Sequence, residues 1–451
     1  MSEMRRTALD RAAAVTLFLA VFAAAAGSSV EADVVSVAKS ARWALLIVLG
    51  VFALVRATAF RSEWRLRPWV AATLGAYCAL TVVSAGWSIH PRFTLERAAT
   101  VSLVVAVTSI LAGCAALSPV TASRLLDALL AAVSAVALAG FLLWLVDPSA
   151  AVQSASNEYP ARFQGFEQNP NTGPMLLAVG MPLAFDRAIT ATSGRVRATF
   201  GLLLLAFVAE LAASGSRGAL VGGFLALLVV AVLAPGSRRR RTGVVLAVVA
   251  LLAATTWTMT IPHALRVSAG AAQGRLPTAS PSRPINAELA IPLSGEIGGP
   301  WWLHTSGVVQ RAFLSSSTRV PAWRGAIEQG FARPIAGYGF GTGESAFANR
   351  YSGFHSDLPE NSYIGVLLQV GLAGLALFLA AVVLCLVPGV RACIRGRGER
   401  DRRLPATLGA ATAALLLGVS QSYFHAAGSI AFLTLWLTLL LSSVAGIKRA
   451  A

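Results

Sequence analysis

Residues 355–361, His-Ser-Asp-Leu-Pro-Glu-Asn, bring together side chains of the types that proton transfer requires. Histidine has the free pKa nearest to working pH, so His355 is a candidate base for turning a hydroxyl into a nucleophile. The apolar run that follows predicts a helix, which Asn361 or Ser362 can cap, and Glu360 would be favoured near its N-terminus. Capping explains part of the cluster but not His355, for which a solvated or structural role is the alternative.

Arg217, in the stretch Ser-Gly-Ser-Arg-Gly, opens another apolar run, where the positive end of the helix macrodipole would repel it. One explanation is an ion pair with Glu210, seven residues earlier and on the same face if the helix continues. The other is an anion clamp, in which the guanidinium and the free backbone N–H groups of the helix N-terminus bind the same phosphate oxygens. The two explanations are compatible.

Arg319 and Arg324 flank Trp323 in a stretch with the signals of a short amphipathic helix. Thr318 can cap this helix and Gly330 can end it. A basic residue at its start can reach a diphosphate held at a membrane surface, and a solvated helix face is the alternative. The apolar positions expected to pack on the rest of the protein are Val320, Trp323, Ile327 and Phe331.

Two further patterns carry little chemical information. Glycines at alternate positions from 337 to 343 can cradle phosphate, but no predicted strand and helix frame them, so a plain turn is the preferred interpretation. The five histidines include no pair spaced i, i+4. The sequence therefore predicts neither a metal site nor a cofactor.

The elements that must position these residues are predicted to be membrane helices. Of the 451 residues, 56% are hydrophobic and 13% are charged, and the mean hydropathy is +0.68. A stretch of about 20 mostly apolar residues is what one helix needs to cross a bilayer. We therefore expect an all-α integral membrane protein with about twelve transmembrane helices and one large periplasmic loop that carries short helices. The apolar runs are 12–29, 41–58, 69–86, 98–117, 125–146, 173–190, 197–213, 218–234, 243–261, 362–387, 404–422 and 428–446.

The net charge of +17 is explained by topology rather than by nucleic-acid binding. With the N-terminus in the cytoplasm, most Lys and Arg, including those at 238–241 and 391–403, fall on the cytoplasmic side, where anionic lipid head groups are their natural partners. Both termini are then cytoplasmic. We expect helices 1 to 9 within 1–261, a periplasmic loop at 262–360, and helices 10 to 12 with the C-terminus in 361–451. No nucleic-acid partner is expected.

Five segments together resemble the O-antigen ligase and polymerase family, in the order expected of it. Residues 84–98 are similar to its Trp-Ser, Pro, Arg-Ala segment, and residues 162–185 to its Gly, Pro-Asn segment. Three later motifs of the family are also matched. They are the Ser-Arg-Gly stretch at 216–218, Arg319 with the tryptophan four residues later, and the helix start after Glu360. Members are multi-spanning enzymes that move glycans from undecaprenyl diphosphate at the outer face of the bacterial inner membrane.

The resemblance implies that Arg217 and Arg319 bind the diphosphate of the donor. The family often has His before Asn, whereas this chain has Glu360 in that position. Either Glu360 or His355 is therefore expected to accept the proton. The possible supporting residues are Arg324, Asn361 and Glu210.

On this resemblance we expect a metal-independent ligase, which transfers a glycan from undecaprenyl diphosphate to a lipid A core sugar hydroxyl at the periplasmic face of the inner membrane. The alternative is a polymerase, whose acceptor is a second lipid-linked glycan, because nothing in the sequence identifies the acceptor. A lipid-linked glycan transporter is a third hypothesis. It predicts charges lining a mid-membrane cavity, whereas Glu210, Arg217 and Arg97 all lie near predicted helix ends.

Overall fold

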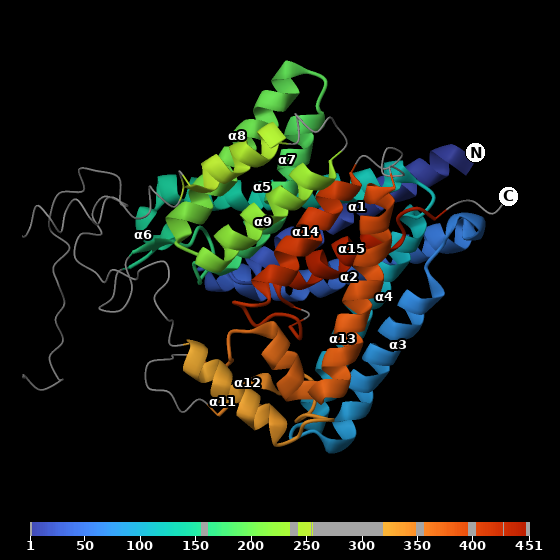
Figure 1. Ribbon diagram of the computed structural model, residues 1–451, viewed down its shortest axis with the longest axis vertical. Helices are drawn as coiled ribbons and strands as arrows, with labels where there is room; N and C mark the ends of the chain where they lie inside the picture. Colours follow the sequence, from blue (N-terminus) through green and yellow to red (C-terminus); the bar gives the residue numbers. More distant parts are fainter. Residues whose placement is uncertain are drawn as a thin grey trace, which may run out of the picture.

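The computed structural model describes residues 2–154, 161–234, 242–253, 255, 319–348, 356–395, 403–426 and 428–447. Most of the loop predicted at 262–360 lies outside the described residues, as does the candidate base His355. The described part is a bundle of helices (Figure 1). The boundaries predicted for the three parts of the chain, and the side of the membrane on which each lies, stay predictions.

Helices form nearly all of the described regular structure. The longer helices are α1 (Ser2–Ala26), α2 (Ala32–Ala59), α3 (Pro68–Val83), α4 (Pro91–Ala115), α5 (Pro119–Val146), α7 (Thr172–Thr190), α8 (Gly194–Ser214), α9 (Arg217–Leu233), α11 (Arg319–Phe331), α13 (Ser362–Ile394), α14 (Leu404–Leu417) and α15 (Ile430–Ser443). The short elements are η1 (Arg61–Glu63), η2 (Ser84–Trp87), α6 (Pro148–Ala151), α12 (Gly343–Ala346) and the antiparallel strands β1 (Val152–Gln153) and β2 (Arg162–Phe163).

Each predicted apolar run overlaps one of these helices or the helix at Thr242–Ala253. By length and composition, seven helices in the described ranges can cross a membrane: α1 to α5, α8 and α13. Shorter apolar helices are α9, Thr242–Ala253, α14 and the body of α15. The fold is therefore that of an all-α, multi-pass membrane protein, and the number of twelve spans stays a prediction.

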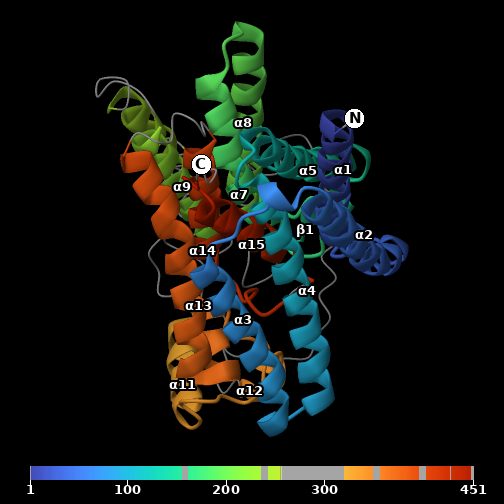
Figure 2. The ribbon, with the colours of Figure 1, turned by 90° about the vertical axis from the view of Figure 1, so that its right-hand side faces the viewer.

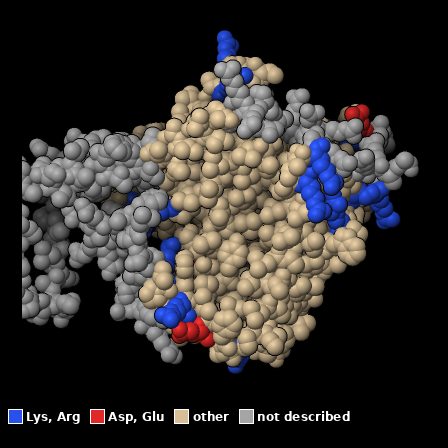
Figure 3. Space-filling view, viewed as in Figure 1, with Lys and Arg blue, Asp and Glu red and all other residues tan. Residues whose placement is uncertain are grey.

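The centre of the bundle is formed by α7, α14 and α15. Nearly all their side chains are buried, as expected of helices that are apolar on every face. α14 packs on α7 and α9, and α15 packs on α4, α13 and α14. Around this centre, α2, α5 and α8 expose leucines and valines, and Figure 3 shows a broad uncharged surface with Lys and Arg at its margins. Such a surface suits contact with lipid.

One predicted run, 362–387, is not a single straight helix. Gly371 interrupts α13 with φ +65° and ψ −167°, and the backbone N–H of Leu372 donates to the carbonyl of Pro334 instead of continuing the helix. A Cβ on Gly371 would lie 2.2 Å from the carbonyl oxygen of Ile335, so only glycine fits this close approach. The first two turns of α13 are thus set apart and carry the site. Figure 2 shows α3, α4 and α13 running together toward α11 and α12.

Helix α11 forms where it was predicted, but its expected apolar stripe is only partly the packed face. Val320 and Phe331 are 54% and 56% exposed. The buried face is made of small residues, including Ala326 and Gly330, and a Cβ on Gly330 would come within 3.3 Å of Leu367. Small residues allow α11 to approach α13 closely, which a search for large apolar side chains does not detect.

Buried ion pairs join helix ends on the side predicted to be cytoplasmic. Arg56, 3% exposed, binds Asp10 at 3.2 Å and Glu63 at 2.7 Å. Arg403 reaches Asp186 at 2.9 Å. These arginines therefore hold helices together in addition to any role in setting membrane orientation.

Candidate active site

The site is built around the N-terminus of α13 and the polar segment 418–429 between α14 and α15. The Asn361 side chain accepts hydrogen bonds from the backbone N–H groups of Tyr363 and Ile364, so the predicted cap is confirmed at Asn361. The Asn361 backbone N–H donates to Ser422 Oγ at 3.0 Å, and the Asn361 side-chain amide Nδ2 donates to the carbonyl of Val419. The start of α13 is thereby fastened to segment 418–429.

Glu360 directly precedes the cap and has a strained backbone. With φ +50°, it is the one non-glycine residue with positive φ in the described ranges. Such conformations cost free energy and concentrate at functional sites. Because Asn361 takes the cap position, Glu360 lies just outside the first turn of α13. Burial raises the pKa of this carboxyl, against the opposing effects of Arg319 and of the Ser356 hydroxyl, which donates to it at 3.2 Å.

Arg319 lies beside Glu360 at the start of α11. Its Nη1 donates to the carbonyl of Ser420 at 3.1 Å, and its charge acts on the Glu360 carboxyl. One turn later, the Trp323 indole N–H donates to the carbonyl of Pro359 at 2.7 Å. Arg319 and Trp323 therefore differ in function. Trp323 holds the segment before Glu360 in place, whereas Arg319 faces the site.

The first turn of α9, which begins at Arg217, approaches the same region. Gly215, with φ +62°, ends α8, and α9 begins at Arg217, so the two helices do not continue into one another. The same-face argument for a pair with Glu210, which stays on α8, therefore does not hold. A Cβ on Gly218 would lie 2.1 Å from Ser420 Oγ, so the first turn of α9 packs directly against Ser420.

Ser420 is thus the meeting point of the two arginine motifs. Its carbonyl binds the Arg319 guanidinium, and its hydroxyl contacts the helix turn that Arg217 begins. Arg324 lies elsewhere, because it is 84% exposed and faces Glu328 on the outer side of α11. The structure thus brings Arg319, Glu360 and Asn361 together, and the first turn of α9, which Arg217 begins, packs on the same segment.

The glycine-rich stretch 337–343 is a turn, as preferred. Gly337, Gly339 and Gly341 have φ between 65° and 105°. Their backbone N–H groups are used within the protein, since Gly339 donates to the carbonyl of Gln369 and Gly341 to its side-chain oxygen. The turn therefore positions α13 and does not serve as a phosphate cradle.

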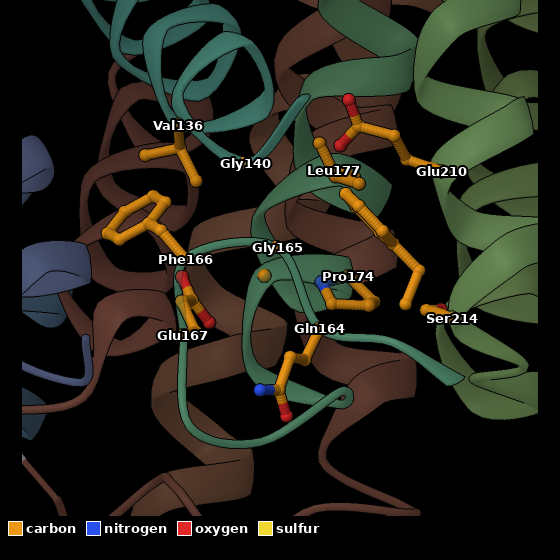
Figure 4. Close-up of a pocket in the computed structure, with 12 residues that line it drawn as sticks. Val136, Gly140, Gln164, Gly165, Phe166, Glu167, Pro174, Leu177, Glu210 and Ser214 are labelled. Atoms are coloured by element: carbon orange, nitrogen blue, oxygen red, sulfur yellow. The ribbon is translucent and has the colours of Figure 1, made fainter. Parts of the chain in front are cut away.

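Glu210 lines a separate, small cavity of about 20 Å³ together with Glu167, which sequence reasoning missed (Figure 4). Figure 4 shows that Glu210 comes from α8 and Glu167 from the segment before α7. Burial raises the pKa of the Glu167 carboxyl well above its usual range, and the Gly173 backbone N–H offsets part of this. A volume of that size admits about one water molecule, so this cavity cannot hold a sugar.

Sequence reasoning also missed Arg42, on the other side of segment 418–429, and His425, which belongs to that segment. Arg42 stands inside the apolar run 41–58, and an ionisable residue in such a run is itself a functional signal. His425 is buried, and its Nδ1 has no hydrogen-bond partner in the part of the chain that the structure describes. Burial, with a contribution from Arg97, lowers its pKa to about 4. Its imidazole is therefore neutral at physiological pH.

The described residues contain no group of three or more His, Cys, Asp or Glu that could hold a metal ion. Residues 201–379 match the family model described as O-antigen ligase. This range contains Arg217, Arg319 and Glu360, whereas the similar segments at 84–98 and 162–185 precede it. No curated protein matches the chain. The family resemblance found in the sequence is confirmed by this match.

Proposed function

From the premise that the chain carries an O-antigen ligase domain, we propose that it transfers a glycan from undecaprenyl diphosphate to a sugar hydroxyl of the lipid A core. In the proposed reaction Arg217 and Arg319 bind the donor diphosphate, and Glu360 is the base. The protein acts at the periplasmic face of the bacterial inner membrane, with both termini in the cytoplasm.

The chemistry is a displacement at the anomeric carbon. Glu360 takes the proton of the acceptor hydroxyl, whose oxygen attacks the anomeric carbon from the face opposite the phosphate. A new glycosidic C–O bond forms, and the bond between the anomeric carbon and the phosphate oxygen breaks. Undecaprenyl diphosphate leaves with the electron pair, and its charge is stabilised by the two guanidinium groups. The proposed reaction therefore needs neither a metal ion nor a cofactor.

The observation that carries this proposal is the shared contact at Ser420. Two arginine motifs from distant parts of the chain approach this residue, and the carboxyl of Glu360 lies next to one of them. A guanidinium pair is suited to a diphosphate because each group can bind two oxygens. A carboxyl with a raised pKa is better suited to accept a proton than an ordinary surface carboxylate.

The test is a transfer assay with the purified full-length protein in a chelator-containing buffer. The substrates are an undecaprenyl-diphosphate glycan and a lipid A core glycolipid. We expect the core glycolipid to gain the glycan and undecaprenyl diphosphate to be released. Lengthening of the lipid-linked chains without modification of the core contradicts the ligase reaction and identifies a polymerase instead. Movement of the donor across a vesicle membrane without bond formation identifies a transporter.

A further inference from the structure

A second, larger cavity lies on the side of segment 418–429 that faces α1, α2 and α7. Its volume is about 230 Å³. The polar side chains that line it include Ser28 from the end of α1, Arg42 from α2, Thr172 from α7, and Gln421, Ser422 and Ser429 from segment 418–429. Among the described residues that line it, the cavity thus has one cation, several hydroxyl and amide groups, and no carboxylate.

Arg42 has no counter-charge among the described residues around this cavity. Its Nη1 donates to the carbonyl of Gly428 at 2.9 Å, while its Nε is buried with no hydrogen-bond partner. No ion pair is formed by Arg42 within the described ranges. A guanidinium has five N–H donors, and within the described residues one hydrogen bond from Arg42 to the protein is seen, through Nη1. Arg42 is half-buried, and its guanidinium carbon lies 5.3 Å from the centre of the Trp43 ring. An anion in the cavity would supply the counter-charge that the described residues do not provide.

A second arginine reinforces the positive potential. Arg97, from α4, lies close enough to act electrostatically on both Arg42 and His425. Its side chain is fixed between the Phe93 ring, 4.7 Å from its guanidinium carbon, and Gly341, where a Cβ would lie 2.6 Å from Arg97 Cγ. Two guanidinium groups on different helices that repel one another are an arrangement suited to a bound anion.

The cavity adjoins the proposed site through segment 418–429. Ser422, which lines the cavity, accepts a hydrogen bond from the backbone N–H of Asn361, the residue after Glu360. Ser420, two residues before Ser422, contacts the two arginine motifs proposed to hold the donor. A ligand in the cavity would therefore lie across this segment from the donor diphosphate, with Glu360 near both.

We propose that this cavity, with Arg42 as its principal cation, binds a phosphate group of the acceptor glycolipid and so places the acceptor hydroxyl near Glu360. The inference rests on the proposed function for the identity of the acceptor. It adds a second anion site, distinct from the donor site at Arg217 and Arg319. The phosphate belongs either to the lipid A core or to the diphosphate of a second lipid-linked chain, and the same recognition chemistry serves both.

The test measures binding directly, using full-length protein in nanodiscs of phosphatidylcholine. The probes are a phosphorylated core glycolipid and the same glycolipid after enzymatic removal of its phosphates. We expect Arg42→Gln to weaken binding of the phosphorylated probe by about tenfold or more, as loss of a charge-assisted hydrogen bond implies, and to leave the dephosphorylated probe unaffected. Equal binding of the two probes to the wild type, or equal weakening of both by Arg42→Gln, overturns the proposal.

Two further variants guard against misfolding. Gln421→Glu keeps the shape of the side chain and adds a negative charge to the cavity. It should therefore weaken binding of the phosphorylated probe about as much as Arg42→Gln does, although Arg42 is still present. Arg195→Gln removes an exposed arginine at the start of α8 and should leave the affinity for both probes unchanged. An unchanged affinity in Gln421→Glu contradicts the assignment of the cavity.

The source of the phosphate is identified in the Arg217→Ala background, where the donor site is impaired. Arg42-dependent binding of the core glycolipid identifies the core phosphate, whereas Arg42-dependent binding of an undecaprenyl-diphosphate glycan identifies a second chain. Competition by phosphatidylglycerol as strong as that by the glycolipid overturns the proposal in favour of a bilayer head group. Because binding is measured without transfer, phosphate-dependent binding by a protein that transfers nothing refutes the proposed function alone. If transfer occurs and the KM for the acceptor is the same in the wild type and in Arg42→Gln, only the proposed acceptor site is refuted.

Discussion

The guanidinium of Arg319 lies close enough to the carboxyl of Glu360 to lower its pKa, yet burial of that carboxyl raises the pKa by more. The two effects leave Glu360 more basic than an ordinary glutamate and still next to a cation. This combination suits a base that must accept a proton beside a leaving diphosphate. Arg319, which also binds the carbonyl of Ser420, thus links the proposed donor site to the proposed base.

Removing either proposed diphosphate ligand should greatly slow transfer. We expect Arg217→Ala and Arg319→Ala each to lower kcat by about 100-fold or more, because each guanidinium stabilises charge that develops on the leaving group. Arg319→Lys should keep part of the activity, since lysine retains the charge but not the bidentate geometry. Initial rates of product formation with saturating donor and acceptor measure these effects.

The matched control for Arg319 is Arg324 on the same helix. Its side chain is exposed and pairs only weakly with Glu328 at 3.7 Å, so Arg324→Ala should stay within about twofold of the wild-type rate. If Arg324→Ala lowers the transfer rate as much as Arg319→Ala does, then α11 acts through its overall charge rather than through Arg319.

Substitution of Glu360 should reveal the base. Glu360→Gln keeps the shape but cannot accept the proton, so we expect kcat to fall by about 100-fold or more while the KM for the donor changes little. In the wild type, activity should rise as pH increases through the pKa of Glu360, which burial places above its usual value. Glu360→His should restore part of the activity with the rising limb moved toward the pKa of imidazole. Rates measured across the pH range check this shift.

His355 is the competing candidate for the base. If His355→Ala abolishes transfer while Glu360→Gln retains it, the assignment to Glu360 is wrong. Glu328→Gln, which removes an exposed carboxylate on α11, serves as the control and should leave the pH profile unchanged.

Much of the helical architecture could be predicted because apolar runs report burial in lipid or in a bundle regardless of which helices pack together. The cap at Asn361 was also predictable, since capping depends on local sequence. Segment 418–429 was not, because the predicted apolar runs 404–422 and 428–446 cover both of its ends. Its function as the support for Arg319 and Asn361 depends on contacts with distant parts of the chain.

The same limit applies to Gly371, whose break in α13 depends on the approach of Ile335. We expect Gly371→Ala to lower the unfolding free energy by about 2 kcal/mol or more, since alanine is strained at φ +65° and would also clash. Gly75→Ala is the control, because a Cβ there meets nothing within 4 Å and alanine favours the helix by up to about 1 kcal/mol. Thermal unfolding in detergent distinguishes the two. Equal melting temperatures for the two variants would show that the break is not required.

His425 should make the fold sensitive to acid. Burial, with a contribution from Arg97, lowers its pKa from the ordinary value of about 6.5 to about 4, so on acidification the unfolded chain binds a proton that the folded protein does not. Stability is therefore unaffected above about pH 6.5 and is lost as pH falls toward 4, by roughly 2 kcal/mol at about pH 5. His425→Gln cannot be protonated and should show a smaller fall in melting temperature between about pH 7.5 and pH 5. His90→Gln, at an exposed histidine before α4, should fall as the wild type does. The same acid-dependent fall in both variants would show that His425 is not the group responsible.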